Sequence, residues 1–421
     1  MENVTVVQNG DENHEVVLRD LQSLLLESIG KDVQVVESTT SLLLPKGENY
    51  ASTMLKVEAL IKRTKSSPEE KLHLVAKMIP SSEFQRSIFN SSVSFAKEIY
   101  VIQTLAPMYK QLEREVGLEE DEIIDIFPKI YAGRLSRNEE TPDVADEDAV
   151  MLLENLKVRG YDTMNRMKGL DFEHAVIAIT QLARYHALGM ALRHKKPKEF
   201  AEAQKIIDNF PFDMTDIKQF EDVIDHTIEV VCSDQRLVQY EQKIRGLITE
   251  QNGFESFMEI EKIEPWISIN HGDFWVNNIM FQHDDEGKVK DIKFVDFQIA
   301  LVCSPLKDLP YFLCASTSTN VMKNQFDELL DAYHAKLVQE LDKLGVDSSP
   351  FTKESFEKSL MLAGKKSLFQ CLMAVKFFTL EVDQELDLNN MKDQVMMAKP
   401  SDLYKERVYM IVKKFAEKGW L

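Results

Sequence analysis

The sequence predicts an α+β protein of two lobes, with an antiparallel sheet in the N-terminal part and a mostly helical C-terminal part. Three observations predict this fold class. The chain of 421 residues is long enough for two or more lobes. Apolar and charged residues alternate before residue 80, as in strands, and apolar residues recur at helical spacing from Phe172 onward. We therefore predict an N-terminal lobe at residues 1–156, ending in the connection between the lobes, and a helical lobe at residues 157–421.

The first predicted elements are a helix and two strands. Residues 15–29 carry a helical stripe of valine and leucine that Gly30 ends. MLKVEALIKR, residues 54–63, alternates apolar with charged side chains and predicts a half-buried antiparallel strand. KLHLVAKMI, residues 71–79, is apolar on both faces apart from one histidine and Lys77, which is the pattern of a central strand.

Lys77 is a candidate binding residue, because a lysine inside such a strand is costly to bury without an anionic partner. In kinases, a lysine on the third strand holds the phosphates of ATP and pairs with a glutamate on the next helix. The next helical stretch, residues 91–109, supplies Glu98 as that partner. The alternatives are a surface lysine whose stem packs along apolar neighbours, and a glutamate on a solvated helix face.

Two more strands and a helical region complete the predicted fold. IFPKIYAGRL at 126–135 and AVMLLENL at 149–156 predict the last strands of the sheet, and we expect the acidic loop between them to be disordered. In the helical lobe, His186 lies on an apolar stripe and is expected to be a core histidine with a hydrogen bond. Residues 215–252 and 323–418 are rich in helical patterns with solvated Lys–Glu faces.

The stretch WISINHGDFWVNNIMF carries the motif on which the functional interpretation depends. An apolar run leads into His-Gly-Asp, Asn278 follows Asp273 by five residues, and a second apolar run ends in Asp296. In phosphotransferases, an aspartate so placed accepts the proton of the attacking hydroxyl, and the asparagine and second aspartate hold metal ions. Singly, each residue is better explained as a turn or capping residue, and only the ordered combination is specific. We predict a catalytic loop at 271–278 and a metal-binding segment at 294–298.

The composition is that of an ordinary globular protein, with 44% hydrophobic and 29% charged residues. A net charge of −20 argues against nucleic acid or an anionic membrane as a partner. No CxxC spacing occurs, so we expect buried free thiols at Cys232, Cys303, Cys314 and Cys371. The N-terminus is polar and acidic, and we expect no apolar run long enough to span a bilayer. These features predict a cytoplasmic protein.

HGDFWVNNIMF, followed by VDFQ and then SPLKDLPYFL, resembles the insect ecdysteroid kinase-like family. That family belongs with choline kinases and aminoglycoside phosphotransferases on the protein-kinase-like fold, and the resemblance runs from about residue 47 to the C-terminal helices. Trp275 and Gln298 mark this branch of the fold. The resemblance implies a bilobal structure with ATP and Mg²⁺ in the cleft, Asp273 as the catalytic residue, and Asn278 and Asp296 as the metal ligands.

The resemblance also places a phosphate-covering turn at PKGENYAS. The family has a G-E-N-x-x-S sequence here in place of the full glycine pattern of protein kinases, so Gly47, Asn49 and Ser52 are candidate phosphate ligands. Successive backbone amides in a turn make an anion-binding concavity. A plain hairpin turn explains the same residues, and the sequence leaves the two interpretations open.

Four further residues take their expected roles from the resemblance. Glu154 and Leu156 fall where the family reads adenine through backbone groups, with Asn155 in place of the family's aspartate. Asp308 is expected to hold the catalytic loop through hydrogen bonds, and the ring of His271 is expected to brace that loop.

The implied function is that of an ATP-dependent small-molecule kinase acting on a hydroxyl group of an ecdysteroid, a related steroid or a xenobiotic alcohol. No activation loop or APE segment follows Asp296, which argues against a peptide substrate. The aromatic and methionine residues at 368–378 line either an apolar acceptor site or simply the core. The alternatives are a choline-, ethanolamine- or aminoglycoside-type kinase of the same fold, a catalytically silent steroid-binding relative, and a helical interaction protein with chance motifs. The sequence names no protein partner and determines neither the acceptor, the oligomeric state nor the regulation.

Overall fold

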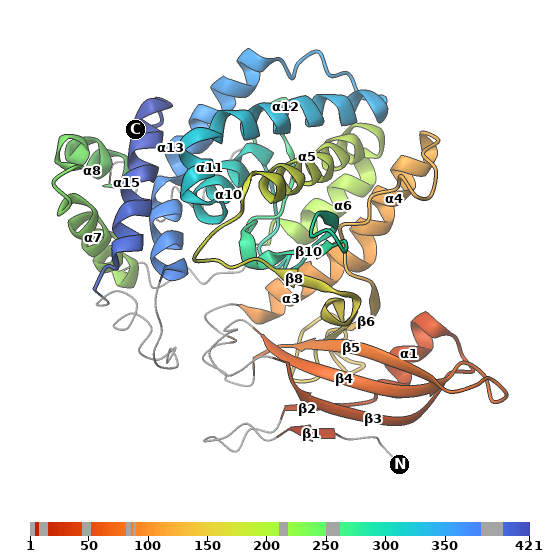
Figure 1. Cartoon of the computed structure of the whole chain (residues 1–421). Coiled ribbons are helices and arrows are strands. Elements are labelled where there is room, and N and C mark those ends of the chain that lie inside the picture. Colours follow the sequence, from red (N-terminus) through yellow and green to blue (C-terminus); the bar gives the residue numbers. More distant parts are fainter. Residues whose placement is uncertain are drawn as a thin grey trace. The chain divides into compact units, whose positions relative to one another are not determined.

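The structure is a computed structural model that describes residues 5–7, 16–43, 52–80, 86, 90–209, 218–249, 262–379 and 399–421 (Figure 1). The described parts of Met1–Pro107, Phe127–Asp162 and Asn209–Asp213 form one compact unit, and those of Met108–Ile126, Thr163–Asp208 and Met214–Leu421 form a second. This division differs from the predicted boundary after residue 156 in three segments. Residues 108–126 group with the second unit, and residues 157–162 and the described Asn209 group with the first.

The first unit is built on a five-stranded sheet with the order β3-β4-β5-β7-β6, antiparallel at every pairing. Its strands are β3 (Gln34–Leu42), β4 (Thr53–Lys62), β5 (Glu70–Met78), β6 (Ile130–Arg134) and β7 (Val150–Glu154). Both predicted strands before residue 80 are present, and β5 is the central strand of the sheet. The structure thus confirms the antiparallel sheet of the predicted α+β class.

The period-two pattern of β4 positions the core of this unit. Leu55, Val57, Ala59 and Ile61 are each at most 1% exposed and pack in one cluster with leucines of α1. Because side chains alternate across a strand, Leu74 and Ala76 of β5 face this same cluster and Lys77 points to the opposite face. A partner for its charge must therefore come from the element on that other face.

The N-terminal helix begins later than predicted. Helix α1 is Leu21–Ile29, whereas Val16–Leu18 form strand β2, which pairs antiparallel with β1, Thr5–Val7. Adjacent β-branched valines favour a strand, and the Asp20 side chain caps α1 by accepting from the Ser23 amide at 3.4 Å. The predicted end at Gly30 is correct, since its φ of 125° is open mainly to glycine.

Helices α3 (Ser91–Tyr100) and α4 (Ala106–Glu115) follow the sheet strand that carries Lys77. They are joined by a π-helical segment, Val101–Leu105. The predicted helix at 91–109 is therefore present and longer than expected. The expectation of a disordered acidic loop is wrong, because residues 137–148 form turns closed by hydrogen bonds such as Asp146 N to Leu135 O at 3.0 Å.

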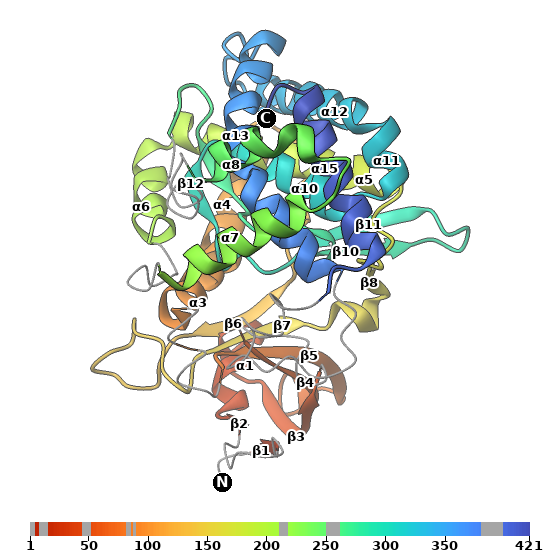
Figure 2. The same ribbon diagram turned by 90° about the vertical axis from the view of Figure 1, so that its left-hand side faces the viewer.

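The second unit is mostly helical, as predicted. Its helices are α5 (Phe172–Lys195), α6 (Pro197–Ile207), α7 (Lys218–Cys232), α8 (Glu241–Thr249), α10 (Asp308–Ser316), α11 (Thr319–Asn324), α12 (Phe326–Lys343), α13 (Lys353–Phe378) and α15 (Asp402–Glu417). Helices α5 and α12 lie side by side (Figure 1), and α13 lies beside α10 and α15 (Figure 2).

Short strands among these helices carry the motif segments. They are β9 (Ser268–Asn270), paired antiparallel with β12 (Leu301–Cys303), and β10 (Ile279–His283), paired antiparallel with β11 (Val289–Phe294). A further strand, β8, is Tyr161–Thr163. The hairpin expected after the catalytic motif is therefore β10–β11.

Helix α5 is the central helix of the second unit and packs directly on β9. A Cβ at Gly189 would lie 2.3 Å from the Ser268 hydroxyl oxygen, so only glycine permits this approach. Among the described residues, α5 is the single helix long and apolar enough to cross a membrane, so the expectation of no such run was too strong. Because 72% of its apolar window is buried inside the protein, its composition is that of a core helix.

The cysteines follow the expectation of free thiols. Cys303, Cys314 and Cys371 are buried, and Cys232 is half-buried. Burial, together with the hydrogen bond between Cys371 and Cys314, raises the pKa of the Cys371 thiol well above its usual value. The buried thiols therefore serve as small core side chains.

Candidate active site

Lys77 and Glu98 form a buried ion pair in the first unit. The Lys77 ammonium lies 2.7 Å from Glu98 Oε2, and the two residues are 4% and 1% exposed. Strand β5 supplies the lysine from its face opposite the leucine core, and α3 supplies the glutamate. Removing one partner of a buried ion pair strongly destabilises the folded protein. The Glu98 carboxylate therefore fixes the position of the Lys77 ammonium group. Its role in holding phosphates stays a prediction.

The other candidate nucleotide ligands are placed only in part. Gly47 and Asn49 lie outside the described residues, and Ser52 precedes β4 with 5% exposure. Glu154 ends β7, and its carboxylate accepts hydrogen bonds from the Lys129 amide and the Arg159 guanidinium at 2.7 and 2.6 Å.

The Glu154 carboxylate is already bonded to Lys129 and Arg159, so any contact of this residue with adenine is expected through its backbone, as the sequence predicts. Leu156 begins a short 3-10 helix, Leu156–Arg159, and is 6% exposed. The adenine-binding role of both residues stays a prediction.

The catalytic loop leaves β9 through a turn that requires glycine. Gly272 has a φ of +83°, and a Cβ on it would lie 2.3 Å from the Ile299 carbonyl oxygen. Both observations exclude a larger residue, because the clash is with backbone and the conformation is left-handed. This turn brings Asp273 next to the backbone that follows β11, where Asp296 lies.

Asp308 anchors this loop from the first turn of α10, as predicted. Its carboxylate accepts from the backbone amides of His271 and Gly272 at 2.9 and 3.1 Å and contacts His186 Nε2 at 3.2 Å. Burial alone would raise the pKa of Asp308, but the hydrogen bonds with the His186 ring and the His271 amide lower that pKa below its usual value. Asp308 is therefore an ionised, buried anchor for two consecutive amides.

His186 and His271 have the structural roles expected of them. His186 is fully buried in α5 and bonds Tyr333 Oη through Nδ1 at 2.8 Å. His271 Nε2 lies 3.1 Å from the Val295 carbonyl oxygen, and its ring packs on Phe297 with centroids 4.5 Å apart. Burial lowers the pKa of His271, which favours a neutral ring that donates to Val295. This bond connects the catalytic loop with the segment that carries Asp296.

Asp273 is held at both carboxylate oxygens. Tyr311 Oη donates to Oδ1 at 2.7 Å, and Asn278 Nδ2 donates to Oδ2 at 2.9 Å. Burial and the nearby Asp296 carboxylate raise the pKa of Asp273 to about 6, against the lowering effect of these hydrogen bonds. A carboxylate with that pKa is suited to accept a proton near neutral pH.

Asn278 and Asp296 lie on adjoining backbone segments, since the Val295 amide donates to the Asn278 carbonyl at 3.0 Å. The Asn278 side-chain nitrogen is used toward Asp273, which leaves its Oδ1 as the atom able to face a cation. Asp296 has a left-handed backbone with φ of 70°, unusual for a residue other than glycine.

An amide oxygen and a carboxylate fit Mg²⁺, which takes few protein ligands and completes its shell with phosphate and water oxygens. The part of the chain that the structure describes holds no cluster of three histidine, cysteine, aspartate or glutamate side chains able to bind a metal on its own. A divalent cation here would therefore depend on oxygens of a bound nucleotide.

Aromatic side chains adjoin Asp273, and the sequence did not reveal their arrangement. The rings of Trp275 and Phe378 stack with centroids 3.9 Å apart and planes 9° from parallel. Tyr311 and Phe377 belong to the same cluster, and Arg166 donates to the carbonyls of Phe377 and Phe378 at 3.0 and 3.2 Å. The end of α13 is thus fixed against the catalytic loop by stacking and by a cap on its last carbonyls.

Tyr311 is the site residue that sequence reasoning missed. The signal was available, because Tyr311 follows Asp308 by three residues on one helix and therefore shares its face. The predicted residues of the second unit, Asp273, Asn278 and Asp296, come together. Lys77, Glu98 and Glu154 lie in the first unit, and each unit's set is described here by itself.

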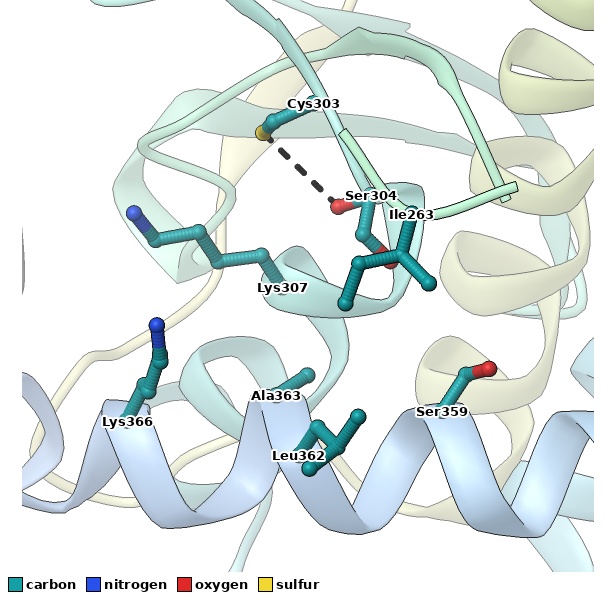
Figure 3. Close-up of a pocket in the computed structure, with 8 residues that line it drawn as sticks. All are labelled: Ile263, Cys303, Ser304, Lys307, Ser359, Leu362, Ala363 and Lys366. Atoms are coloured by element: carbon teal, nitrogen blue, oxygen red, sulfur yellow. Dashed lines mark hydrogen bonds between the residues drawn. The ribbon is translucent and has the colours of Figure 1, made fainter. Parts of the chain in front are cut away.

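The segment that precedes Asp308 also lines a small pocket (Figure 3). It is lined by Ile263, Cys303, Ser304, Lys307, Ser359, Leu362, Ala363 and Lys366. Figure 3 shows the ammonium groups of Lys307 and Lys366 at one end of it and the Ser359 hydroxyl at the other. None of the predicted site residues lines this pocket, so it is separate from the catalytic loop.

Comparisons with known proteins give one match in sequence and several in fold. The model of the ecdysteroid kinase-like family matches residues 46–346. No curated protein matches the chain.

Similar solved structures include an ethanolamine kinase of Plasmodium vivax, at 10% identity and a TM-score of 0.37, covering 90% of this chain and 84% of that one. A choline kinase of Cryptosporidium parvum is 11% identical with a TM-score of 0.42, covering 93% and 92%. The GDP complex of aminoglycoside 2'-phosphotransferase-IIIa is 12% identical with a TM-score of 0.40, covering 94% and 98%.

Proposed function

Because the chain belongs to the ecdysteroid kinase-like family, we propose that it transfers the γ-phosphoryl group of ATP to a hydroxyl of an ecdysteroid or of a related steroid or xenobiotic alcohol. The observation that carries this proposal is the setting of Asp273. Its carboxylate is fixed at both oxygens, lies beside Asn278 and Asp296, and has a pKa raised to about 6.

In the proposed reaction, the acceptor hydroxyl oxygen bonds to the γ-phosphorus as the bond to the β–γ bridging oxygen breaks, and ADP leaves. The hydroxyl proton passes to the Asp273 carboxylate, which the hydrogen bonds from Tyr311 and Asn278 hold in one orientation. Phosphoryl transfer depends mainly on alignment and on charge stabilisation, so a fixed base contributes by orienting the nucleophile.

Cations at the phosphates supply the charge stabilisation. Asn278 Oδ1 and the Asp296 carboxylate would hold Mg²⁺, which when bound neutralises the negative charge on the phosphate oxygens. Lys77 is proposed to add a fixed positive charge at the phosphates. Its position is set by Glu98, 2.7 Å away and almost fully buried. Gly47, Asn49 and Ser52 at the turn before β4, and backbone groups at Glu154 and Leu156, are proposed as further nucleotide contacts.

The class of acceptor is inferred from the aromatic side chains beside the base. Trp275 stands two residues after Asp273, and it and Phe377 are the partly exposed members of the cluster around Tyr311 and Phe378. A stacked indole offers a broad apolar face, which suits a fused-ring alcohol whose hydroxyl reaches Asp273. Substituting Trp275 by alanine should therefore raise the KM for a steroid alcohol while leaving the KM for ATP unchanged.

The proposal is tested by measuring ATP consumption with Mg²⁺ against ecdysteroids, plant sterols, choline and aminoglycosides, for wild type and Asp273→Asn. Turnover on a steroid that the variant loses would support both the mechanism and the acceptor class. Turnover on choline or an aminoglycoside alone would overturn the acceptor class and keep the mechanism. No turnover and no thermal stabilisation by Mg–ATP would instead indicate a catalytically silent binding protein.

A further inference from the structure

We propose that Tyr311 is a positioning residue for phosphoryl transfer, holding the Asp273 carboxylate in the orientation in which it receives the acceptor proton. The inference rests on the proposed function and goes beyond it by assigning a residue outside the catalytic motif. The phenol oxygen of Tyr311 lies 2.7 Å from Asp273 Oδ1, and the tyrosine is only 6% exposed. A carboxylate carries no proton and can only accept, so the Tyr311 hydroxyl is the donor in this hydrogen bond.

The first turn of helix α10 carries both Asp308, which anchors the catalytic loop, and Tyr311. Asp308 and Tyr311 are three residues apart, so they project from one helix face toward the catalytic loop. Asp308 fixes the backbone amides of His271 and Gly272, and Tyr311 fixes the side chain of the next residue, Asp273. One rigid turn thus holds both the backbone and the functional group of the loop.

The two carboxylate oxygens of Asp273 accept from donors on two different elements. Asn278, from the loop itself, donates to Oδ2, while Tyr311 donates to Oδ1. With either donor removed, the carboxylate would be free to rotate about its terminal torsion, which is intrinsically broad. Each oxygen can accept more than one hydrogen bond, so Tyr311 leaves room for an acceptor hydroxyl.

An opposite role for Tyr311, as a plug that occupies the acceptor's place, fits the structure less well. A plug must move aside, and Tyr311 is held in a helix whose first residue is buried and bonded to two backbone amides. Its ring also packs with Ala315, Ala374 and Phe378 in one cluster. The two roles predict opposite effects of removing the hydroxyl, so one substitution separates them.

The test compares Tyr311→Phe with Tyr404→Phe in the full chain. Tyr404 is the matched control, since its hydroxyl is also buried, has no hydrogen-bond partner and lies in α15 away from the catalytic loop. We expect Tyr311→Phe to lower kcat roughly ten- to a hundredfold, with the KM for ATP and stabilisation by Mg–ATP unchanged. Tyr404→Phe should leave kcat unchanged.

A second readout does not depend on turnover or on a known acceptor. With 3-fluorotyrosine at position 311, the ¹⁹F resonance should shift when Asp273 is replaced by asparagine, whereas a label at position 404 should not respond. An unchanged or increased kcat in Tyr311→Phe, or an unmoved resonance at 311, would overturn the inference. So would equal losses of kcat in both phenylalanine variants. If wild type itself turns over no alcohol and is not stabilised by Mg–ATP, the proposed function fails, and the resonance shift still decides whether Tyr311 holds Asp273.

Discussion

Replacing Asp273 by asparagine should abolish activity and at the same time stabilise the protein. The structure raises the pKa of this carboxyl from 3.8 to about 6, chiefly through burial and the Asp296 charge. A raised pKa means that the folded protein holds the ionised form less favourably than the unfolded chain does. Ionised Asp273 therefore lowers the free energy of unfolding of the wild-type enzyme.

The size of that cost follows from the shift. Roughly two pKa units at about 1.4 kcal/mol per unit give about 3 kcal/mol. Because Asp273 is partly exposed to solvent, we expect a cost of about 1–3 kcal/mol. Asparagine keeps the hydrogen bonds, because its oxygen can accept from Asn278 and its amide can donate to the Tyr311 oxygen, whose hydroxyl rotates. The substitution thus removes the charge without leaving a buried group unsatisfied.

The pKa values of the folded and unfolded states determine at which pH ionised Asp273 destabilises the protein. Below about pH 3.8 the carboxyl is protonated in both states and costs nothing, and above about pH 6 the whole cost is present. The free energies of unfolding of wild type and Asp273→Asn, measured with urea in EDTA, should therefore diverge between pH 4 and pH 7 with the variant the more stable. A variant that is equally stable or less stable at pH 8 would refute this account of the Asp273 environment.

Further substitutions test the other parts of the site. Lys77→Met should destabilise the protein by about 3–5 kcal/mol, since the buried Glu98 carboxylate loses its ion pair at 2.7 Å. The double variant with Glu98→Leu should recover most of that stability in urea unfolding but not ATP turnover; recovery of both would remove Lys77 from the mechanism. Gly272→Ala should unfold the loop locally and abolish turnover, because its Cβ would meet the Ile299 carbonyl oxygen at 2.3 Å, and full activity would show that the turn is not required. Asp308→Asn should cost about 1.5–3 kcal/mol at neutral pH. Because the pKa of Asp308 is lowered in the folded state, wild-type stability from this group is lost as pH falls, so the two unfolding curves should converge in acid and a constant difference would contradict the assignment.

The fold was predictable wherever a residue pattern is local. The alternation in β4 and the apolar central strand β5 follow from side-chain direction alone, and the helix with Glu98 follows from its periodicity. The start of α1 was missed because Val16 and Val17 fit a helical stripe as well as a strand, and pairing with β1 decided between them. The turns of the loop between β6 and β7 depend on specific hydrogen bonds, which composition alone does not predict.

The candidate site was predictable in its motif residues and not in its surroundings. Asp273, Asn278 and Asp296 stand at fixed spacings, and Asp308 was expected to hold the loop through hydrogen bonds, as it does. Tyr311 and the Trp275–Phe378 stack depend on how α10 and α13 pack, which no spacing in the sequence determines. The pKa of Asp273 likewise follows from burial and from a neighbour 23 residues away along the chain.

The most direct test of the central claim is transfer of label from [γ-³²P]ATP to an ecdysteroid in the presence of Mg²⁺, measured for wild type and Asp273→Asn. The account predicts labelled steroid with wild type and none with the variant, while Mg–ATP raises the melting temperature of both proteins. Equal labelling by the two proteins would contradict the role of Asp273, and the absence of both labelling and stabilisation in wild type would contradict the kinase assignment itself.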